Sequence, residues 1–242
     1  MIIAESIGFA ATHSITEILG NVPEVEVSHG SQHFERKSPL GKGSQSIDEF
    51  LSSMEAAQDA GRSPVAVHTL FPPQDMKPAC DAAGVDYWLL VRDPVAQIES
   101  CYAWIARSTL EGNSSHFLQV LKVALNPLSA MQTEASLPNA LYYYAVNHVL
   151  SFNFLAIGLG APTRKMEELL SDEAAFREAF AIDLDVTLPH FAGEAVHRAS
   201  HRSHKEVEAL AAPEREKILD RYSLSFGGRS YRLADMQMLL GY

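Results

Sequence analysis

The chain of 242 residues is poor in cysteine and lacks long apolar segments. Its two cysteines, Cys80 and Cys101, cannot build a disulfide framework, so nothing in the sequence demands an oxidising compartment. No segment approaches the roughly 18 consecutive apolar residues of a membrane-spanning helix. The first residues have no basic stretch and are interrupted by Glu5, which is not the pattern of a secretory signal peptide. We therefore expect a soluble, cytoplasmic protein without a membrane span.

Basic residues are also scarce, and this limits the partners of the chain. Lys and Arg number 19 against 30 Asp and Glu, which gives a formal net charge of -11 at pH 7. Such a chain repels nucleic acid and anionic membrane or glycan surfaces unless its basic residues cluster locally. Apolar residues make up 47% of the chain, enough for a full core. No repeat or long linker divides the sequence, so we expect a single domain over residues 1–242.

Apolar strand-like segments alternate with amphipathic segments in the first half of the chain. Capping-box patterns, in which a Ser precedes a Glu by three residues, predict helices that begin near Ser14 and Ser46. Gly84 predicts a helix end, and Pro94 predicts a helix start. Continuously apolar strands between helices are typical of a parallel sheet covered on both faces, an α/β three-layer sandwich. The predicted strands are residues 2–7, 25–27, 64–70, 86–91 and 152–157.

The carboxyl ends of the predicted strands hold the candidate chemistry, because ligands bind at that edge of an open parallel sheet. Residues 8–14 are mostly small and lead into a helix N-terminus, whose amides and dipole favour an anion. The layout is that of a phosphate loop, although the second Gly and the Lys of a Walker A motif are missing. An ordinary strand-to-helix turn is the alternative interpretation.

Two later strand ends carry groups that suit acid–base chemistry and anion binding. His68 follows an apolar strand and is either a general base or a hydrogen-bonded structural residue. Arg92 follows the next strand, Asp93 is placed to cap a helix, and Ser100 lies two turns along that helix. An Arg and a hydroxyl that converge on one oxyanion suit phosphate recognition. The alternative is a surface Arg beside a capping Asp.

The segment LLVRDPVAQIESCYAW resembles the 3′-phosphate-binding segment of sulfotransferases, which use 3′-phosphoadenosine-5′-phosphosulfate as donor. In that family a strand-end Arg and a Ser eight residues later hold the 3′-phosphate, and these positions match Arg92 and Ser100. The segment VHTLFPP resembles the strand that carries the catalytic base, matched by His68. RKMEELLSDEAAF resembles a further family segment, with Glu167 and Glu168 at its acidic pair, and MQMLLGY resembles the end of many bacterial members.

The segment GFAATHSITEIL stands where the family has its 5′-phosphosulfate-binding loop. The resemblance implies that this loop contacts the donor, and it matches Phe9 to the family's basic residue, so that group is missing here. His13, at the same helix start, or Lys42 would have to supply the missing charge. His68 and His13 are therefore the candidate catalytic residues. The candidate donor-binding residues of the loop are Phe9, Ala10, Ala11, Thr12, His13 and Ser14.

Residues 195–205 form the dense basic patch of this acidic chain. Sulfotransferases have an Arg-Lys-Gly loop near the C-terminus that closes on the 3′-phosphate, and the resemblance assigns this role to Arg198 or Arg202. A metal site is the alternative, because a helix would place His197, His201 and His204 on one face. A solvated basic face is a third interpretation.

The resemblance implies a P-loop-like three-layer α/β fold and sulfuryl transfer from 3′-phosphoadenosine-5′-phosphosulfate to a hydroxyl or amine, without a metal. The acceptor would be a small molecule, a glycan or a lipid, and a homodimer is left open. One alternative is a nucleotide-binding protein on the same fold without transferase activity. The other is a metal-dependent hydrolase that uses the three histidines of the basic patch.

Overall fold

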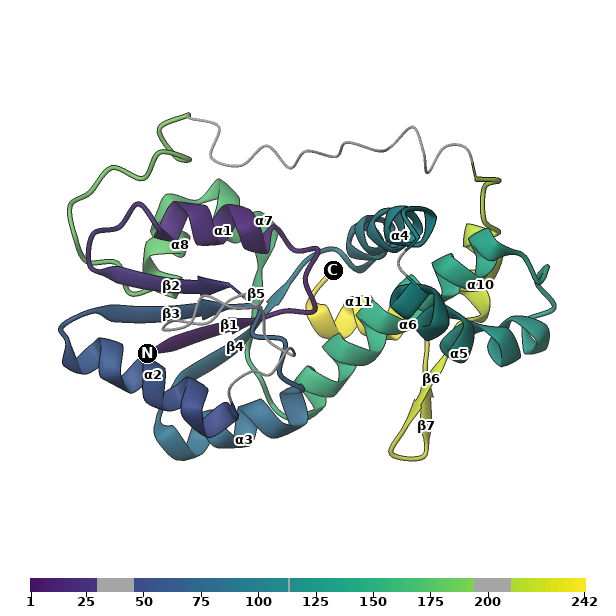
Figure 1. The fold of residues 1–242 in the computed structure, drawn as a ribbon, viewed down its shortest axis with the longest axis horizontal. Helices are drawn as coiled ribbons and strands as arrows, with labels where there is room; N and C mark the ends of the chain where they lie inside the picture. Colours follow the sequence, from purple (N-terminus) through teal and green to yellow (C-terminus); the bar gives the residue numbers. More distant parts are fainter. Residues whose placement is uncertain (30–45, 113, 194–209) are drawn as a thin grey trace. The chain divides into compact units, whose positions relative to one another are not determined.

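The computed structural model describes residues 1–29, 46–112, 114–193 and 210–242 (Figure 1). The chain divides into two compact units, which are described separately. The first contains Met1–Arg92 and Leu155–Arg198, and the second contains Asp93–Phe154 and Ala199–Tyr242. The predictions at Lys42 and at residues 195–205, including Arg198, Arg202 and the three histidines, lie outside the described residues.

A parallel sheet forms the centre of the first unit. Its strand order is β2-β3-β1-β4-β5, and every neighbouring pair is parallel. The predicted α/β class with a mainly parallel central sheet is therefore confirmed. The strands are β1 (Ile2–Glu5), β2 (Val25–His29), β3 (Ser63–Val67), β4 (Asp86–Val91) and β5 (Thr163–Lys165).

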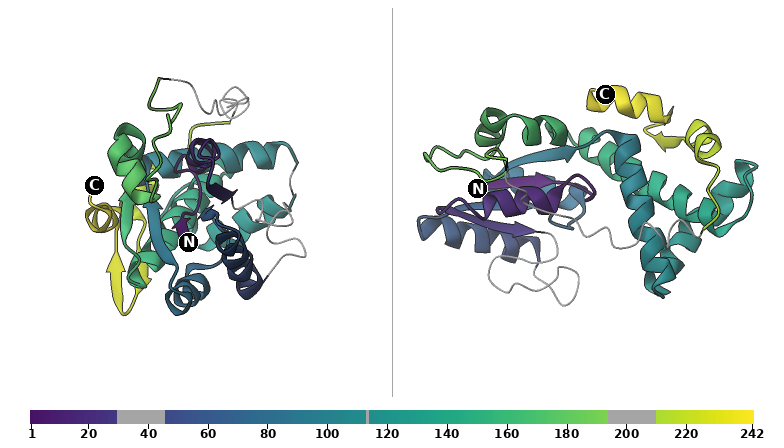
Figure 2. Two further views of the ribbon diagram at one scale, coloured as in Figure 1. Left: turned by 90° about the vertical axis from the view of Figure 1, so that its left-hand side faces the viewer. Right: turned by 90° about the horizontal axis from the view of Figure 1, so that it is seen from above.

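Helices cover both faces of this sheet (Figure 1). One face carries α1 (Thr12–Leu19), α7 (Met166–Ser171) and α8 (Glu173–Ala179), and the other carries α2 (Ile47–Asp59) and α3 (Pro73–Ala83). Figure 2 shows these layers from two further directions. On the α1 side, Trp88 packs against Phe180 with 5.4 Å between the ring centroids. The buried core on this side also contains Ile15, Ile18, Leu19, Val65, Val67, Leu90 and Phe176.

Local signals predict some helix ends correctly and one wrongly. Ser46 caps α2 in a complete capping box with Glu49, and Gly84 ends α3 in the left-handed conformation. The capping box predicted at Ser14 is wrong. Helix α1 begins at Thr12, directly after Ala11, and its start has no side-chain cap. The left-handed turn at Ala11 redirects the chain before Ser14 is reached, so Ser14 lies inside the first turn of the helix.

The second unit is mainly helical. Helix α6 (Leu137–Gly158) begins in this unit and contains residues 152–157, so the strand predicted there is wrong. Buried residues lie all around α6, among them Tyr142, Ala145 and Val149, and an apolar run of this kind does not distinguish helix from strand. The other elements are α4 (Pro94–Leu110), α5 (Ser114–Ala130), α10 (Arg215–Arg221), β6 (Leu224–Phe226), β7 (Arg229–Tyr231) and α11 (Leu233–Leu240).

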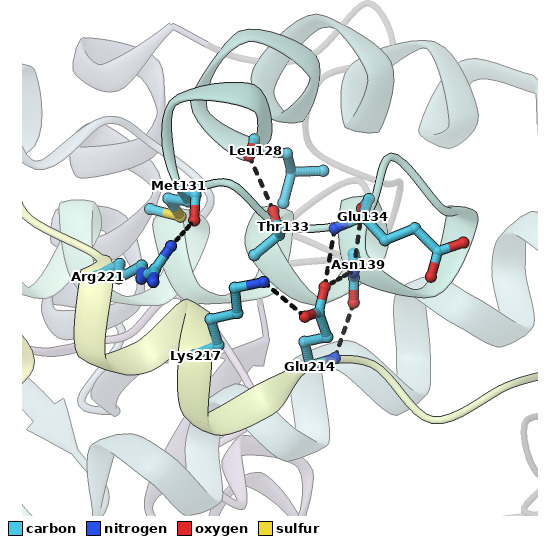
Figure 3. A network of polar contacts seen from close by, with 8 residues as sticks. All are labelled: Leu128, Met131, Thr133, Glu134, Asn139, Glu214, Lys217 and Arg221. Carbon is cyan, nitrogen blue, oxygen red and sulfur yellow. Dashed lines mark hydrogen bonds and ion pairs between the residues drawn. The ribbon is translucent and has the colours of Figure 1, made fainter.

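A polar network joins the start of α10 to the turn before α6 (Figure 3). The Glu214 carboxylate accepts hydrogen bonds of 2.8 Å from the Glu134 amide, from Asn139 Nδ2 and from Lys217 Nζ. Asn139 Oδ1 accepts in turn from the Glu214 amide. These donors, Lys217 first, lower the pKa of Glu214 and keep it ionised. In the part of the chain that the structure describes, no helix is long and apolar enough to cross a membrane.

Candidate active site

The strand order places two strand ends with oppositely directed connections side by side at the carboxyl edge of the sheet in the first unit. The chain leaves β1 through α1 toward β2, and it leaves β3 through α3 toward β4. Strands β1 and β3 are hydrogen-bonded neighbours, with Ala4 paired to Val67. Their connections therefore depart in opposite directions and on opposite faces of the sheet, which opens the edge between them. The loop after β1 and the residues after β3 meet at this edge.

The loop after β1 is sharply bent. Gly8, Phe9 and Ala11 have φ angles of 92°, 61° and 52°, the left-handed region that residues with a Cβ rarely adopt. Each such residue other than Gly costs on the order of 1 kcal/mol or more, and residues of this kind cluster at functional sites. Ala10 is fully buried between them. Helix α1 starts immediately after the bend, and the first amides of a helix have no partner within it. The loop therefore suits an anion.

His68 is the first residue after β3, and its ring lies over this loop. A Cβ added at Gly8 would lie 3.6 Å from His68 Cε1. His68 Nδ1 is 2.5 Å from the carbonyl oxygen of Ser6. Because a carbonyl oxygen only accepts, Nδ1 must carry the proton, and Nε2 keeps its lone pair. Burial lowers the pKa of His68, which keeps the imidazole neutral near pH 7. A neutral ring with a free lone pair is the form a general base needs.

His29, at the end of β2, completes a cluster of three histidines that sequence reasoning missed. Its ring stacks on His13 with 4.1 Å between centroids and lies 5.4 Å from the ring of His68. His29 Nε2 is 3.0 Å from Thr12 Oγ1. Burial, followed by repulsion from the other two rings, lowers the pKa of His29 to about 3. One sequence feature could have identified this cluster, because each of the three histidines lies at or after the end of one of the first three strands. The second strand was predicted to end at residue 27, so His29 was not placed at its end.

Arg92, the residue that follows β4, reaches the same loop. Its Nη1 donates a hydrogen bond of 3.0 Å to the carbonyl oxygen of Phe9. Ser14 lies in the first turn of α1 and is partly exposed. The structure thus brings the predicted residues of the loop together with His68 and Arg92, and it adds His29.

Other predicted residues lie elsewhere in the chain. Ser100 belongs to α4 of the second unit, where its hydroxyl donates to the Ala96 carbonyl oxygen at 3.0 Å. Asp93 caps that helix by accepting from the Ala96 amide at 2.8 Å, as the sequence predicts. Glu167 and Glu168 lie in the first turn of α7. Across residues 1–29, 46–112, 114–193 and 210–242, no group of three or more His, Cys, Asp or Glu side chains is arranged to hold a metal ion.

Glu5, the last residue of β1, is a second group that sequence reasoning missed. Its side chain is fully buried, and Oε1 accepts from the amides of Ser6 and Thr69, each at 3.0 Å. The Thr69 hydroxyl donates to Oε2. Burial raises the pKa of Glu5 to about 7, against the effect of these hydrogen bonds. An acidic residue at the end of an otherwise apolar strand was the signal that could have identified it.

No protein-family model matches this sequence, and no curated protein matches it. Among solved structures, the chain is similar to a sulfotransferase from Alicyclobacillus acidocaldarius, with a TM-score of 0.51 and 14% sequence identity. The match covers 99% of this chain and 94% of that one. At this level of identity the likeness shows the fold. The chain therefore has a sulfotransferase-like α/β fold.

Acid should destabilise the protein through His29. Its pKa falls from the ordinary 6.5 to about 3 on folding, so between these values the unfolded chain binds the additional proton. The free energy of unfolding should therefore decrease as the pH falls from 6.5 toward 3, by at most about 1.4 kcal/mol per pH unit for one proton. Urea denaturation at a series of pH values should show a flatter slope for His29→Asn than for the unsubstituted protein.

Thr12→Val is the matched control for this measurement, because it removes the hydroxyl that contacts His29 and keeps the imidazole. It should lower stability but keep the original pH slope. Glu5 titrates in all three proteins, so its contribution cancels in the differences. Equal slopes for His29→Asn and the unsubstituted protein would contradict the assignment.

Proposed function

We propose that the protein is a sulfotransferase that moves a sulfuryl group from 3′-phosphoadenosine-5′-phosphosulfate to a hydroxyl or amine. The observation that carries this proposal is the state of His68. Its Nδ1 is committed to the Ser6 carbonyl, so a basic Nε2 remains at the carboxyl edge of the sheet, over the loop that begins α1. The likeness in fold to a sulfotransferase supports the same assignment.

The residues around the loop after β1 fit an anionic donor. They include the Arg92 guanidinium, which lies against Phe9, and the first turn of a helix without a side-chain cap. The Thr12 hydroxyl is a further donor when the adjacent His29 supplies its own proton to Thr12 Oγ1. We assign the sulfate and the 5′-phosphate to residues 9–14, and the 3′-phosphate to Arg92. The role of Ser100, in the second unit, stays a prediction of the resemblance. Arg198 or Arg202, which lie outside the described residues, would add a further contact to the 3′-phosphate.

In this proposal the bound donor supplies an activated sulfuryl group on a phosphate oxygen. His68 Nε2 accepts the proton of the acceptor hydroxyl or amine, so the acceptor atom can form its bond to sulfur while the sulfur–oxygen bond to phosphate breaks. The loop holds the anionic groups in line with the acceptor, and its fixed donors stabilise charge on the departing oxygen. Protein donors are sufficient for this role, so the proposal contains no metal.

Phe9 favours a second candidate function on the same fold. It occupies the position that the resemblance matches to a basic residue, which neutralises the departing oxygen in sulfotransferases. His13 is the nearby replacement, because it lies in the first turn of the same helix and stacks on His29. If His13 does not supply this charge, the protein binds the nucleotide without transferring the sulfuryl group. The acceptor is a small molecule, a glycan or a lipid.

Nucleotide binding tests the donor site directly. Calorimetric titration with 3′-phosphoadenosine-5′-phosphate should give micromolar binding, and adenosine 5′-phosphate should bind much more weakly because it lacks the 3′-phosphate. Arg92→Ala should weaken binding of the first nucleotide by about tenfold or more, the size expected for one charged hydrogen bond.

Arg62→Ala is the matched control for Arg92→Ala. Arg62 also donates to a main-chain oxygen, that of Val25, but this contact lies at the amino ends of the strands. Its removal should leave nucleotide affinity unchanged. Failure of both nucleotides to bind the unsubstituted protein would refute the donor site.

Removal of the base should abolish turnover and spare binding. In His68→Ala, transfer from 3′-phosphoadenosine-5′-phosphosulfate to a screened acceptor should fall by about 100-fold or more, the usual contribution of a general base. Because the pKa of His68 lies below its ordinary 6.5, the rate of the unsubstituted enzyme should reach a plateau above that pH. The calorimetric affinity for 3′-phosphoadenosine-5′-phosphate serves as the control. Turnover that survives in His68→Ala would exclude this role.

His13 is tested by a pair of substitutions. His13→Ala removes the donor at the start of α1, and we expect turnover to fall about tenfold through lost stabilisation of the departing oxygen. His13→Gln keeps an N–H donor and should recover part of the rate. Unchanged turnover in both variants would assign the charge stabilisation to another residue.

A further inference from the structure

Glu5 belongs to no part of the proposed reaction, yet its carboxylate contacts both segments that hold His68. Oε1 accepts from the amides of Ser6 and Thr69, and the Thr69 hydroxyl donates to Oε2. Ser6 and Thr69 lie at the ends of neighbouring strands, β1 and β3. One buried side chain therefore ties together two neighbouring strand ends at the carboxyl edge of the sheet.

The segments at Ser6 and at Thr69 both determine how the His68 ring lies. The Ser6 carbonyl oxygen accepts from His68 Nδ1, and the Ser6 amide is held by Glu5, so the carboxylate fixes the residue that determines the tautomer. Ser6 Oγ also accepts from the Gly8 amide at 3.0 Å, which extends the connection into the loop under the ring. On the other side, the amide of Thr69 belongs to the peptide group directly after His68.

The backbone of His68 requires this support. His68 has φ 57° and Leu70 has φ 69°, so two residues with a Cβ adopt the left-handed conformation within three positions. This conformation is unfavourable for a residue with a Cβ, and it persists where surrounding contacts determine it. The hydrogen bonds from the Thr69 amide and hydroxyl to Glu5 lie between these two residues.

The surroundings of Glu5 favour this directional role over a simple ion pair. Among the described residues, the titratable groups whose pKa its charge raises include Cys80 on α3 and Tyr87 on β4. Burial, together with the charge of Glu5, raises the pKa of Cys80 to about 12. The same two causes raise the pKa of Tyr87, so both groups stay neutral. The contacts described for the carboxylate are therefore three hydrogen-bond donors, all from the segments next to His68.

We infer that Glu5 is a positioning residue, whose carboxylate sets the orientation and the Nδ1–H tautomer of His68 by holding Ser6 and Thr69. The three hydrogen bonds from Ser6 and Thr69 to Glu5 are called the clamp below. With the clamp in place, the lone pair of His68 Nε2 has one fixed direction. Without it, the ring can turn and either nitrogen can carry the proton. The use of that lone pair in sulfuryl transfer rests on the proposed function, whereas the clamp itself does not.

The tautomer is measurable without turnover. Nitrogen-15 NMR of histidine-labelled full-length protein distinguishes a protonated from an unprotonated ring nitrogen, and the spectrum of His68→Asn identifies the His68 signals. At about pH 8, above the pKa of Glu5, the unsubstituted protein should show the Nδ1–H form. Glu5→Gln should show a mixture of both tautomers, because the side-chain nitrogen that replaces Oε2 cannot accept from the Thr69 hydroxyl. An unchanged single tautomer in Glu5→Gln would overturn the inference.

Two further variants separate positioning from folding. Thr69→Val removes the hydroxyl and should shift the tautomer in the same direction, while Thr69→Ser keeps the hydroxyl and should retain the original spectrum. Glu26→Gln, on strand β2, is the control for loss of a carboxylate in the same sheet and should also retain the original spectrum. If Glu5→Gln fails to fold, the Thr69 pair decides, and equal spectra for Thr69→Val and Thr69→Ser would overturn the inference.

Kinetics then tests the link to the reaction. In Glu5→Gln, kcat should fall about tenfold with KM for the donor unchanged, because a misoriented base affects the chemical step and not donor binding. A shifted tautomer in a protein whose unsubstituted form transfers no sulfuryl group would sustain the clamp and refute the proposed function. A shifted tautomer with unchanged kcat in an active enzyme would overturn the positioning role.

Discussion

Parallel pairing of β1 with β3 is the constraint on which the site in the first unit depends. The two strands are distant in sequence, and the helices that follow them leave on opposite faces of the sheet. Their carboxyl ends therefore form an open edge where the loop of residues 6–11 meets His68. The contact is closed by the bond from His68 Nδ1 to the Ser6 carbonyl oxygen, which determines which imidazole nitrogen keeps its lone pair.

Strain and buried polarity are concentrated at this edge. Phe9, Ala11, His68 and Leu70 all have positive φ, and Glu5 lies fully buried beside them. Each feature costs free energy, so the apolar layers on both faces of the sheet must offset it. Rings such as Trp88 and Phe180 supply that burial on the α1 side. A rigid, well-packed sheet thus allows a short segment of unfavourable backbone to persist where binding groups converge.

Electrostatics at this edge keep histidines neutral rather than charged. His29 and His68 both have lowered pKa values, because burial and the neighbouring rings disfavour the imidazolium form. Neutral rings suit proton acceptance and hydrogen bonding, whereas a cluster of imidazolium ions would suit charge neutralisation. Arg92 and the helix start bring positive charge to the loop, Phe9 is apolar, and the proposed function adds His13 as a further donor. This division separates the base from the groups that would hold an anion.

The sequence by itself determined the α/β class, the parallel strands and the candidates His68 and Arg92, because apolar runs and strand ends are local features. It also predicted the Ser46 cap and the end of α3 at Gly84. It failed for residues 152–157, since an evenly apolar segment has no period, and at Ser14, where a left-handed Ala11 overrides the capping pattern. Only the tertiary structure decided the contacts of Glu5 and His29. Their partners, Thr69 just after β3 and His13 in α1, belong to other segments that the order of the sheet brings beside them.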